Sequence, residues 1–308
     1  MIKSYVLNIW ISVILAIVIP ILFSYISYKK ANIFYDLRFE VEKRSKPFKQ
    51  ENYFYKFVRK TTPRYYRELV ILHFKAFIRK KEVIIKLIYI IGIICVLGLF
   101  IYFSFESQII TLIIEPIYIP IMLEITFDKN IITIIISWMG GLIFGIFMGM
   151  YDFIGPKELL FTYKKSPRGI KALIFSYLYE LLFILLIYDI VLTIFFTIVF
   201  RLVFLISLLF FLMYIINSMI IVLQAIGIQG IRPLFEERRK NLIVNNYLIL
   251  FFQIISFLIT LLIFIPVFPE TISHYLGFML IILINQWISG CIAISIFYLG
   301  IRKLNVLE

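Results

Sequence analysis

The sequence alternates between long apolar runs and short stretches rich in Lys and Arg. The runs are long enough to cross a bilayer, since about 20 residues at 1.5 Å per residue span about 30 Å of hydrocarbon. All but three of the 31 Lys and Arg residues, Lys3, Lys129 and Arg201, lie in four polar stretches between or after these runs. Basic residues gather on the cytoplasmic side of membrane spans. We therefore predict an all-α integral membrane protein with about seven transmembrane helices.

The composition agrees with this class. Hydrophobic residues make up 62% of the 308 residues, whereas about 45–50% is usual in soluble domains. The net charge of +13 would suggest nucleic acid in a soluble protein. On a membrane protein, cytoplasmic bases meet anionic lipid headgroups instead. We expect a multi-pass protein of the cell (plasma) membrane that contacts the lipid bilayer and binds no nucleic acid.

The individual spans follow from the apolar runs. The run from Ala172 to Gln229 would be about 87 Å long as one helix, so it must form two spans with a turn near Arg201. The other predicted spans are Tyr5–Ser27, Ile84–Phe105, Ile131–Phe153, Tyr247–Val267 and Tyr275–Ile301. Seven spans place the N-terminus outside and the C-terminus in the cytoplasm. This topology leaves only Lys3, Lys129 and Arg201 outside, in agreement with the expected position of basic residues.

The residue pattern of the polar segment after the first span changes along its length, from polar to amphipathic. We interpret residues 1–27 as an N-terminal transmembrane helix, 28–64 as a basic cytoplasmic linker, 65–82 as an amphipathic helix and 83–308 as a six-span core. The helix is expected at the membrane surface, because Lys75 and Arg79 share one side of it while Val70 and Phe74 share another.

The apolar stretch between the second and third spans does not read as a span. It contains Glu115, Pro116 and Pro120, which disfavour an ordinary spanning helix. If it did span, the Lys-rich segment after the third span would lie outside. We therefore expect 108–127 to be an extracytoplasmic loop or a re-entrant element.

Familiar catalytic motifs do not occur in the sequence. It has no GxxxxGK[ST] phosphate loop, no HExxH and no GxSxG. We predict a chain that is not an enzyme and holds no cofactor or metal. Cys95 and Cys291 lie in apolar runs and are expected to be small buried residues. His73 and His274 are far apart, and each is expected to be satisfied or interfacial.

Two acidic residues lie inside the fourth span, Glu180 near its cytoplasmic end and Asp189 just beyond its middle. A bare charge in hydrocarbon costs at least about 2.5 kcal/mol, so each is a candidate for an intramembrane polar site. They lie about 180° apart around a helix and cannot act as one carboxylate pair. For Asp189, pairing with a polar neighbour is favoured over a proton relay.

Two further features concern the third span and the segment after it. Gly141, Gly145 and Gly149 form a smooth strip that another helix can approach closely, within the protomer or across a subunit contact. After the span, Glu158–Lys165 can form a short helix. Such a helix, held in the cytoplasm between two spans, would allow a soluble partner to move the spans. The alternative is an ordinary basic loop.

Together these elements resemble the membrane subunit of type-2 ATP-binding-cassette (ABC) exporters. In that family an amphipathic elbow helix precedes the first core span, a place that Tyr65–Glu82 matches. A coupling helix follows the second core span, and Lys157–Gly169 is similar to it. The stretch Gly227–Glu236, followed by Asn241, is similar to a segment of larger permeases. The resemblance covers roughly Tyr65 to the C-terminus and rests on position more than on invariant residues.

The resemblance implies a permease that works by alternating access, with ATP and Mg held by a separate ABC ATPase subunit and with a second membrane subunit, in a homo- or heterodimer. The ATPase-coupling surface would comprise Lys157, Glu158, Lys164, Lys165 and Arg168, with Arg67, Glu68 and Arg79 on the elbow. The additional N-terminal span departs from the six-span family core. The chain could thus correspond to the second half of a double-length permease.

Two other functional classes stay open. An ion-coupled secondary transporter would use Asp189 or Glu180 as an ion site, although the internal repeat or broken helices often expected there are lacking. A non-transporting scaffold or assembly protein would need only the glycine strip and the basic face. The aromatic content of 18% fits a lipid, peptide or hydrophobic substrate, but it fits contact with lipid equally well.

Overall fold

The computed structural model describes residues 53–79, 81–105, 109–114, 121–126, 129–151, 169–232, 238–267 and 274–306, together with Tyr25. The chain divides into two compact units, Met1–Val58 and Arg59–Glu308. Helix α2 (Tyr53–Thr61) begins in the first unit. The described helices of the second unit are α3 (Arg67–Arg79), α4 (Lys81–Phe105), α5 (Lys129–Tyr151), α7 (Gly169–Phe200), α8 (Phe204–Ile231), α9 (Arg238–Val267) and α10 (His274–Val306).

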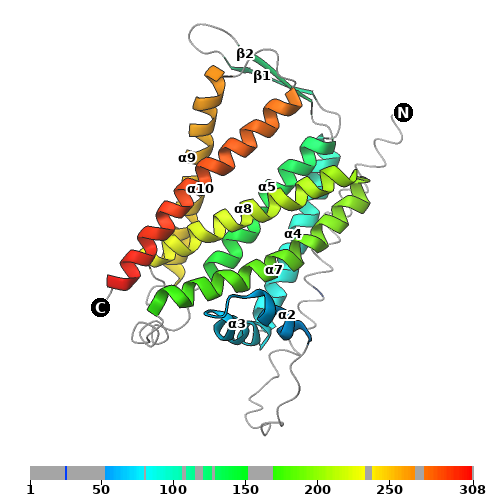
Figure 1. Cartoon of the computed structure of the whole chain (residues 1–308). Coiled ribbons are helices and arrows are strands. Elements are labelled where there is room, and N and C mark those ends of the chain that lie inside the picture. The colour runs from blue at the N-terminus through cyan, green and yellow to red at the C-terminus, as the bar shows by residue number, and fades with distance from the viewer. Residues whose placement is uncertain are drawn as a thin grey trace. The chain divides into compact units, whose positions relative to one another are not determined.

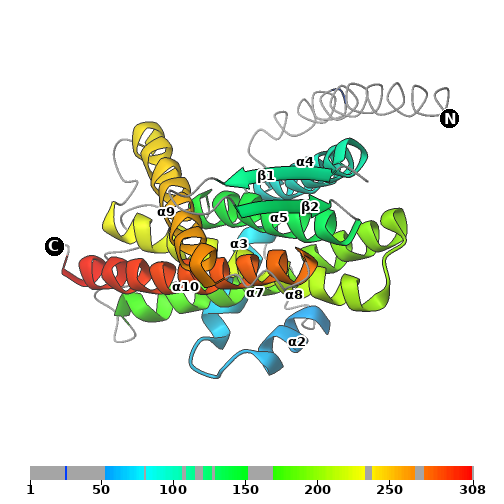
Figure 2. The same cartoon turned by 90° about the horizontal axis from the view of Figure 1, so that it is seen from above.

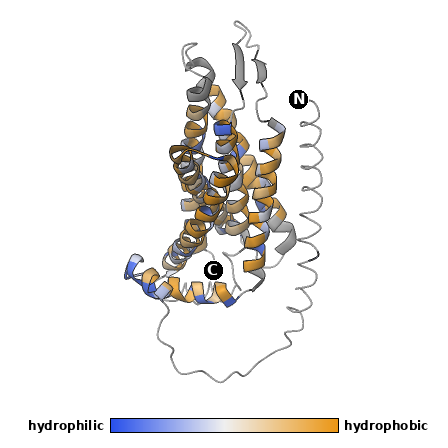
Figure 3. Cartoon of the chain, turned by 90° about the vertical axis from the view of Figure 1, so that its right-hand side faces the viewer, coloured by the Kyte–Doolittle hydropathy of each residue, from blue (hydrophilic) through white to orange (hydrophobic). Residues whose placement is uncertain are grey.

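Among the described helices of the second unit, six are long and apolar enough to cross a membrane, namely α4, α5 and α7 to α10. Hydrophobic colour covers most of their length in Figure 3. They correspond to the six spans predicted for the core, which makes the chain a multi-pass membrane protein. The remaining predicted span, Tyr5–Ser27, lies outside the described residues except for Tyr25.

The turn predicted near Arg201 is confirmed, because α7 ends at Phe200 and α8 begins at Phe204. Arg201 has a φ of 51°, the left-handed conformation in which many helices end. The hydroxyl of Thr197 donates to the hydroxyl of Ser207 across the turn at 2.9 Å. The turn is short, and the two helices run side by side in opposite directions (Figure 1).

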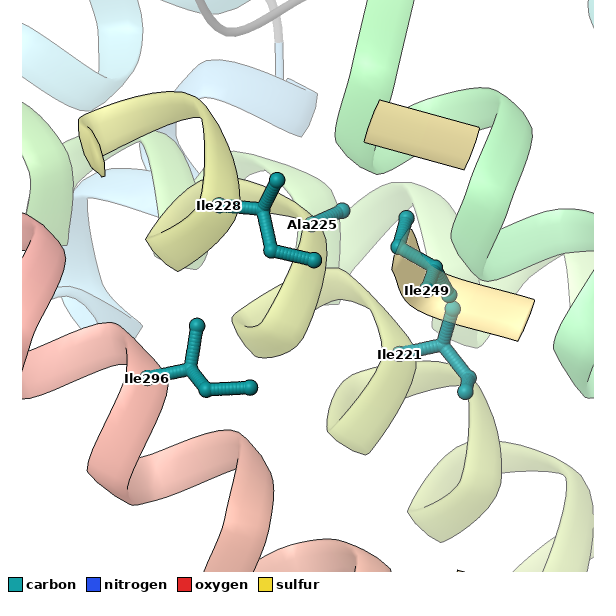
Figure 4. Close-up of a cluster of buried hydrophobic side chains, with 5 residues drawn as sticks. All are labelled: Ile221, Ala225, Ile228, Ile249 and Ile296. Carbon is teal, nitrogen blue, oxygen red and sulfur yellow. The ribbon is translucent and has the colours of Figure 1, made fainter. Parts of the chain in front are cut away.

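Helix α8 is the central helix of this unit. It packs against α5, α7, α9 and α10, and Figure 1 shows it between α7 and α10. Part of the hydrophobic core lies where α8, α9 and α10 meet (Figure 4), and consists of Ile221, Ala225, Ile228, Ile249 and Ile296. Each of these side chains is at most 8% exposed.

The segment 108–127 is predicted to be an extracytoplasmic loop or a re-entrant element. Its described residues form an antiparallel hairpin of β1 (Ile109–Ile114) and β2 (Ile121–Thr126), and its position on the outer side of the membrane stays a prediction. Both strands are rich in Ile, Leu and Thr, and at six residues each they are too short to cross a bilayer. Figure 2 shows the hairpin across the ends of the helices. The other described elements are helical, as predicted.

Two element boundaries also differ from the sequence prediction. The segment predicted as a basic linker contains helix α2. The amphipathic helix predicted over 65–82 is α3, which begins at Arg67, and α4 already begins at Lys81. Helix α3 begins behind Pro63, whose carbonyl oxygen accepts the backbone N–H of Tyr66 at 3.0 Å and of Arg67 at 3.1 Å.

Candidate functional site

The predicted coupling segment falls outside the described residues, because α5 ends at Tyr151 and the next described residue is Gly169. The candidates on it are Lys157, Glu158, Lys164, Lys165 and Arg168. The remaining candidates lie in three places within the second unit. These are the region where α3 contacts α7, the interfaces of α8 with its neighbours, and the buried middle part of α7 that carries Asp189.

Helix α3 lies along the N-terminal half of α7. Its buried residues are Val70, Ile71 and Phe74. The Phe74 ring packs against Phe183, with 6.0 Å between the centroids. Just before α3, the Tyr66 ring lies 5.8 Å from the ring of Tyr179. Aromatic contacts therefore hold α3 against more than one turn of α7.

A polar pair lies within this aromatic contact. His73 Nδ1 lies 3.9 Å from Glu180 Oε2, and the Glu180 side chain is only 4% exposed. The His73 ring also meets the edge of Tyr177, at 5.9 Å between centroids. His73 and Glu180 were predicted separately from the sequence, whereas the structure brings them together. A signal existed, because His73 directly precedes Phe74 and follows Val70 by three residues, and so borders the apolar side of its helix.

The outer side of α3 carries charged residues together with the exposed Leu72 and Ile78. Glu68 and Arg79 are exposed and Arg67 is half-buried. Arg59 Nη2 lies 3.4 Å from Glu68 Oε2, and both side chains are open to solvent, so this pair contributes less than about 1 kcal/mol to stability. Helix α3 thus buries an apolar side against α7, and its charged residues lie on the side away from α7.

Gly141, Gly145 and Gly149 of α5 lie against α8. They face Asn217, Ile221 and Ala225, respectively. A Cβ atom on Gly145 would lie 2.5 Å from the Cβ of Ile221, and one on Gly149 would lie 2.6 Å from the Cβ of Ala225. Of the two arrangements left open by the sequence, the structure has the strip packed within the protomer.

Helix α8 approaches α10 equally closely near its C-terminal end. A Cβ atom on Gly230 would lie 2.8 Å from the backbone of Gly300, and one on Gly227 would lie 2.6 Å from the backbone nitrogen of Phe297. This second contact was not predicted from the sequence. Its signal is weak, because the three glycines come from two helices and form no repeat within either.

Polar side chains join α8, α9 and α10 inside the bundle. We call them the polar seam: Gln224, Gln253, Ser256, Thr260, Asn285 and Ser289. The Gln253 amide nitrogen donates to Gln224 Oε1 and to Ser289 Oγ, each at 2.8 Å. Ser256 Oγ donates to Asn285 Oδ1 at 2.9 Å. None of the six is more than 5% exposed, so the seam links three helices by uncharged hydrogen bonds.

Asp189 lies apart from the pair of His73 and Glu180. It is completely buried on α7 and accepts a hydrogen bond from Thr193 Oγ1 at 3.3 Å. The polar neighbour favoured by the sequence analysis is thus present one turn along the same helix. The structure does not bring Asp189 and Glu180 together.

The cysteines differ from the expected burial. Cys95 is half-buried and Cys291 is exposed on α10. The prediction of a buried position was wrong for Cys291, because the outer side of a spanning helix can carry apolar residues that contact lipid. Both cysteines are free thiols.

A scan against protein-family models, a search of the curated proteins and a search of the solved structures each found no match for this chain.

Proposed function

We propose that this chain is the permease subunit of an ATP-driven exporter of the type-2 ABC class in the cell membrane. The substrate is unidentified and would be a lipid, a peptide or another hydrophobic molecule. A separate ATPase subunit would bind ATP and Mg, and a second membrane subunit would complete the path. The proposal includes seven spans, an external N-terminus and the elbow role of α3.

One observation carries this proposal, the packing of α3 along α7. Helix α7 follows the basic segment 152–168, which we assign to the coupling of an ATPase. Helix α3 precedes α4 and contacts α7 through His73 and Phe74, and Tyr66 just before it contacts α7 as well. A force on the basic segment or on α3 would therefore reach the same helix.

In the proposed cycle, two ATPase subunits close around ATP and push the segment that holds Lys164 and Lys165. Helix α7 tilts, and α3 moves with it. The close glycine contacts keep α5, α8 and α10 together during this step. A path for substrate then opens between this protomer and the second membrane subunit.

The test is purification of the tagged chain from its native membrane in mild detergent, followed by mass spectrometry. We expect a soluble protein with a phosphate-binding loop to co-purify. The double variant Lys164→Glu, Lys165→Glu should lose this partner. A matched control reverses two other basic residues on the same predicted side, Arg302 and Lys303, both exposed on α10, and should keep it.

Recovery of the chain without any ATPase would contradict the proposal. Flux that depends on an ion gradient would then favour the secondary transporter. Stable association with another protein and no flux would favour the scaffold. Recovery of the ATPase with both double variants would keep the exporter but remove Lys164 and Lys165 from its coupling surface.

A further inference from the structure

Asp189 occupies the interior of the helix bundle. It lies about midway along α7 and is 0% exposed. The neighbouring Tyr188 ring packs against Phe144 of α5, with 4.8 Å between centroids. It also stacks near Tyr214 of α8, at 6.3 Å and an interplanar angle of 21°. The carboxyl group thus lies beside a close-packed aromatic cluster where α5, α7 and α8 meet.

The hydrogen bonds of Asp189 leave one carboxyl oxygen unused. Thr193 Oγ1 donates to Oδ1 at 3.3 Å. The second oxygen, Oδ2, is buried and has no hydrogen-bond partner within the described part of the chain. No Lys, Arg or His of those ranges forms an ion pair with this carboxyl group.

The titratable groups around Asp189 are weak acids. They are Tyr188, which precedes it on α7, and Tyr214 on α8, and Cys95 of α4 lies near both tyrosines. Free phenols and thiols are neutral at pH 7, so these three groups supply no positive charge to balance a carboxylate.

The other helices that pack against α7 bring no described cation to this level. Helix α5 contributes the ring of Phe144. Helix α3 contributes His73, which faces Glu180. Glu180 lies about 13 Å from Asp189 along the α7 axis. Helix α10 meets α7 near the start of α7, where Phe297 of α10 packs against Phe175.

A carboxylate in this place would be unstable. A charged carboxylate at the centre of a membrane costs at least about 2.5 kcal/mol, and an unpaired buried acid takes up a proton instead of keeping its charge. We propose that Asp189 is a proton-binding site inside the membrane, in which a proton bonds to Oδ2 while Oδ1 accepts the hydrogen bond from Thr193. Binding forms one O–H bond and neutralises the side chain. This inference does not depend on the proposed exporter function.

Infrared spectroscopy of the full chain in lipid bilayers at neutral pH tests this site. We expect a C=O stretching band of a protonated carboxylic acid that shifts when the protein is transferred to D2O. The Asp189→Asn variant should lose the band. The Glu180→Gln variant is the matched control, because Glu180 is buried on the same helix but faces His73, and it should keep the band.

A second variant tests the same site if Asp189→Asn does not fold. Thr193→Val removes the hydrogen bond to Oδ1, and weaker hydrogen bonding at a carbonyl raises its stretching frequency. The band should therefore move to higher frequency in this variant. Absence of a protonated-acid band in the wild-type chain would overturn the proposal. A band that Glu180→Gln removes, or that Thr193→Val leaves unmoved, would also overturn it.

Discussion

At the scale of single residues, the contacts of α8 depend on the smallest side chains. Gly141, Gly145 and Gly149 allow α5 to approach it on one side, and Gly300 allows α10 to approach it on another. Membrane helices gain little from hydrophobic burial against each other, because lipid is equally apolar. Close approach increases dispersion contacts, which become a main source of stability in this setting.

We expect Gly145→Ala to lower the stability of the chain by about 1–3 kcal/mol. The new Cβ atom would lie 2.5 Å from the Cβ of Ile221, so the two helices must separate. Gly290→Ala on α10 is the matched control, because its Cβ atom would be 3.7 Å from the nearest atom of Ile220, an ordinary contact. Thermal unfolding in detergent measures both. Equal melting temperatures would contradict the close packing of α5 on α8.

Two serines of α10 allow a similar comparison for the polar seam. Ser289 is buried and accepts a hydrogen bond from Gln253 of α9. Ser295 is exposed and donates to the backbone oxygen of Cys291 on its own helix. We expect Ser289→Ala to cost about 0.6 kcal/mol, and at most about 1.7, whereas Ser295→Ala should have a smaller effect. The same unfolding assay tests this, and a larger loss for Ser295→Ala would argue against the seam.

At the scale of elements, α3 is held on α7 by a mixture of ring contacts and one polar pair. We expect His73→Ala to increase amide hydrogen exchange throughout α3, because it removes the imidazole that faces Glu180 and packs against Tyr177. Leu72→Ala is the matched control, since Leu72 is 58% exposed on the same helix, and its exchange should stay close to that of the wild-type chain. Similar exchange in both variants would mean that His73 does not hold the helix.

The elements show where sequence reasoning succeeded. Spanning helices were predictable because their apolar runs match the thickness of a bilayer, and the turn at Arg201 because one helix of that length would be too long. The hairpin was not predictable in the same way. Short apolar runs such as Ile109–Ile114 have the same composition in strands and in buried helices.

The partners of polar residues were also out of reach. Gln253, Asn285 and Ser289 are isolated in apolar runs, and their spacing shows at most which side of a helix they share. Which helix faces that side depends on packing between segments far apart in the chain. The same reason hid the pairing of His73 with Glu180.

At the scale of the whole molecule, the predicted topology places Arg201 and Lys303 on opposite sides of the membrane. Arg201 lies in the turn between α7 and α8, and Lys303 lies near the end of α10, and both are exposed. We expect a membrane-impermeant maleimide applied to intact cells to label Arg201→Cys and not Lys303→Cys, after Cys95 and Cys291 are replaced. Permeabilised cells should show both labelled. The reverse pattern would mean an inverted orientation.

The central position of α8 has a consequence for how the chain is made. Helices enter the membrane in the order of their synthesis, so α8 is in place before α9 and α10 exist. Until they arrive, Gln224 and the glycine surface around Gly227 lack the neighbours they have in the finished bundle. During synthesis there is therefore a stage at which Gln224 and the glycine surface of α8 are exposed to lipid or to an insertion chaperone. Arrival of α9 and α10 supplies these neighbours, and a ribosome that stalls before α10 would leave a product that membrane quality control can recognise.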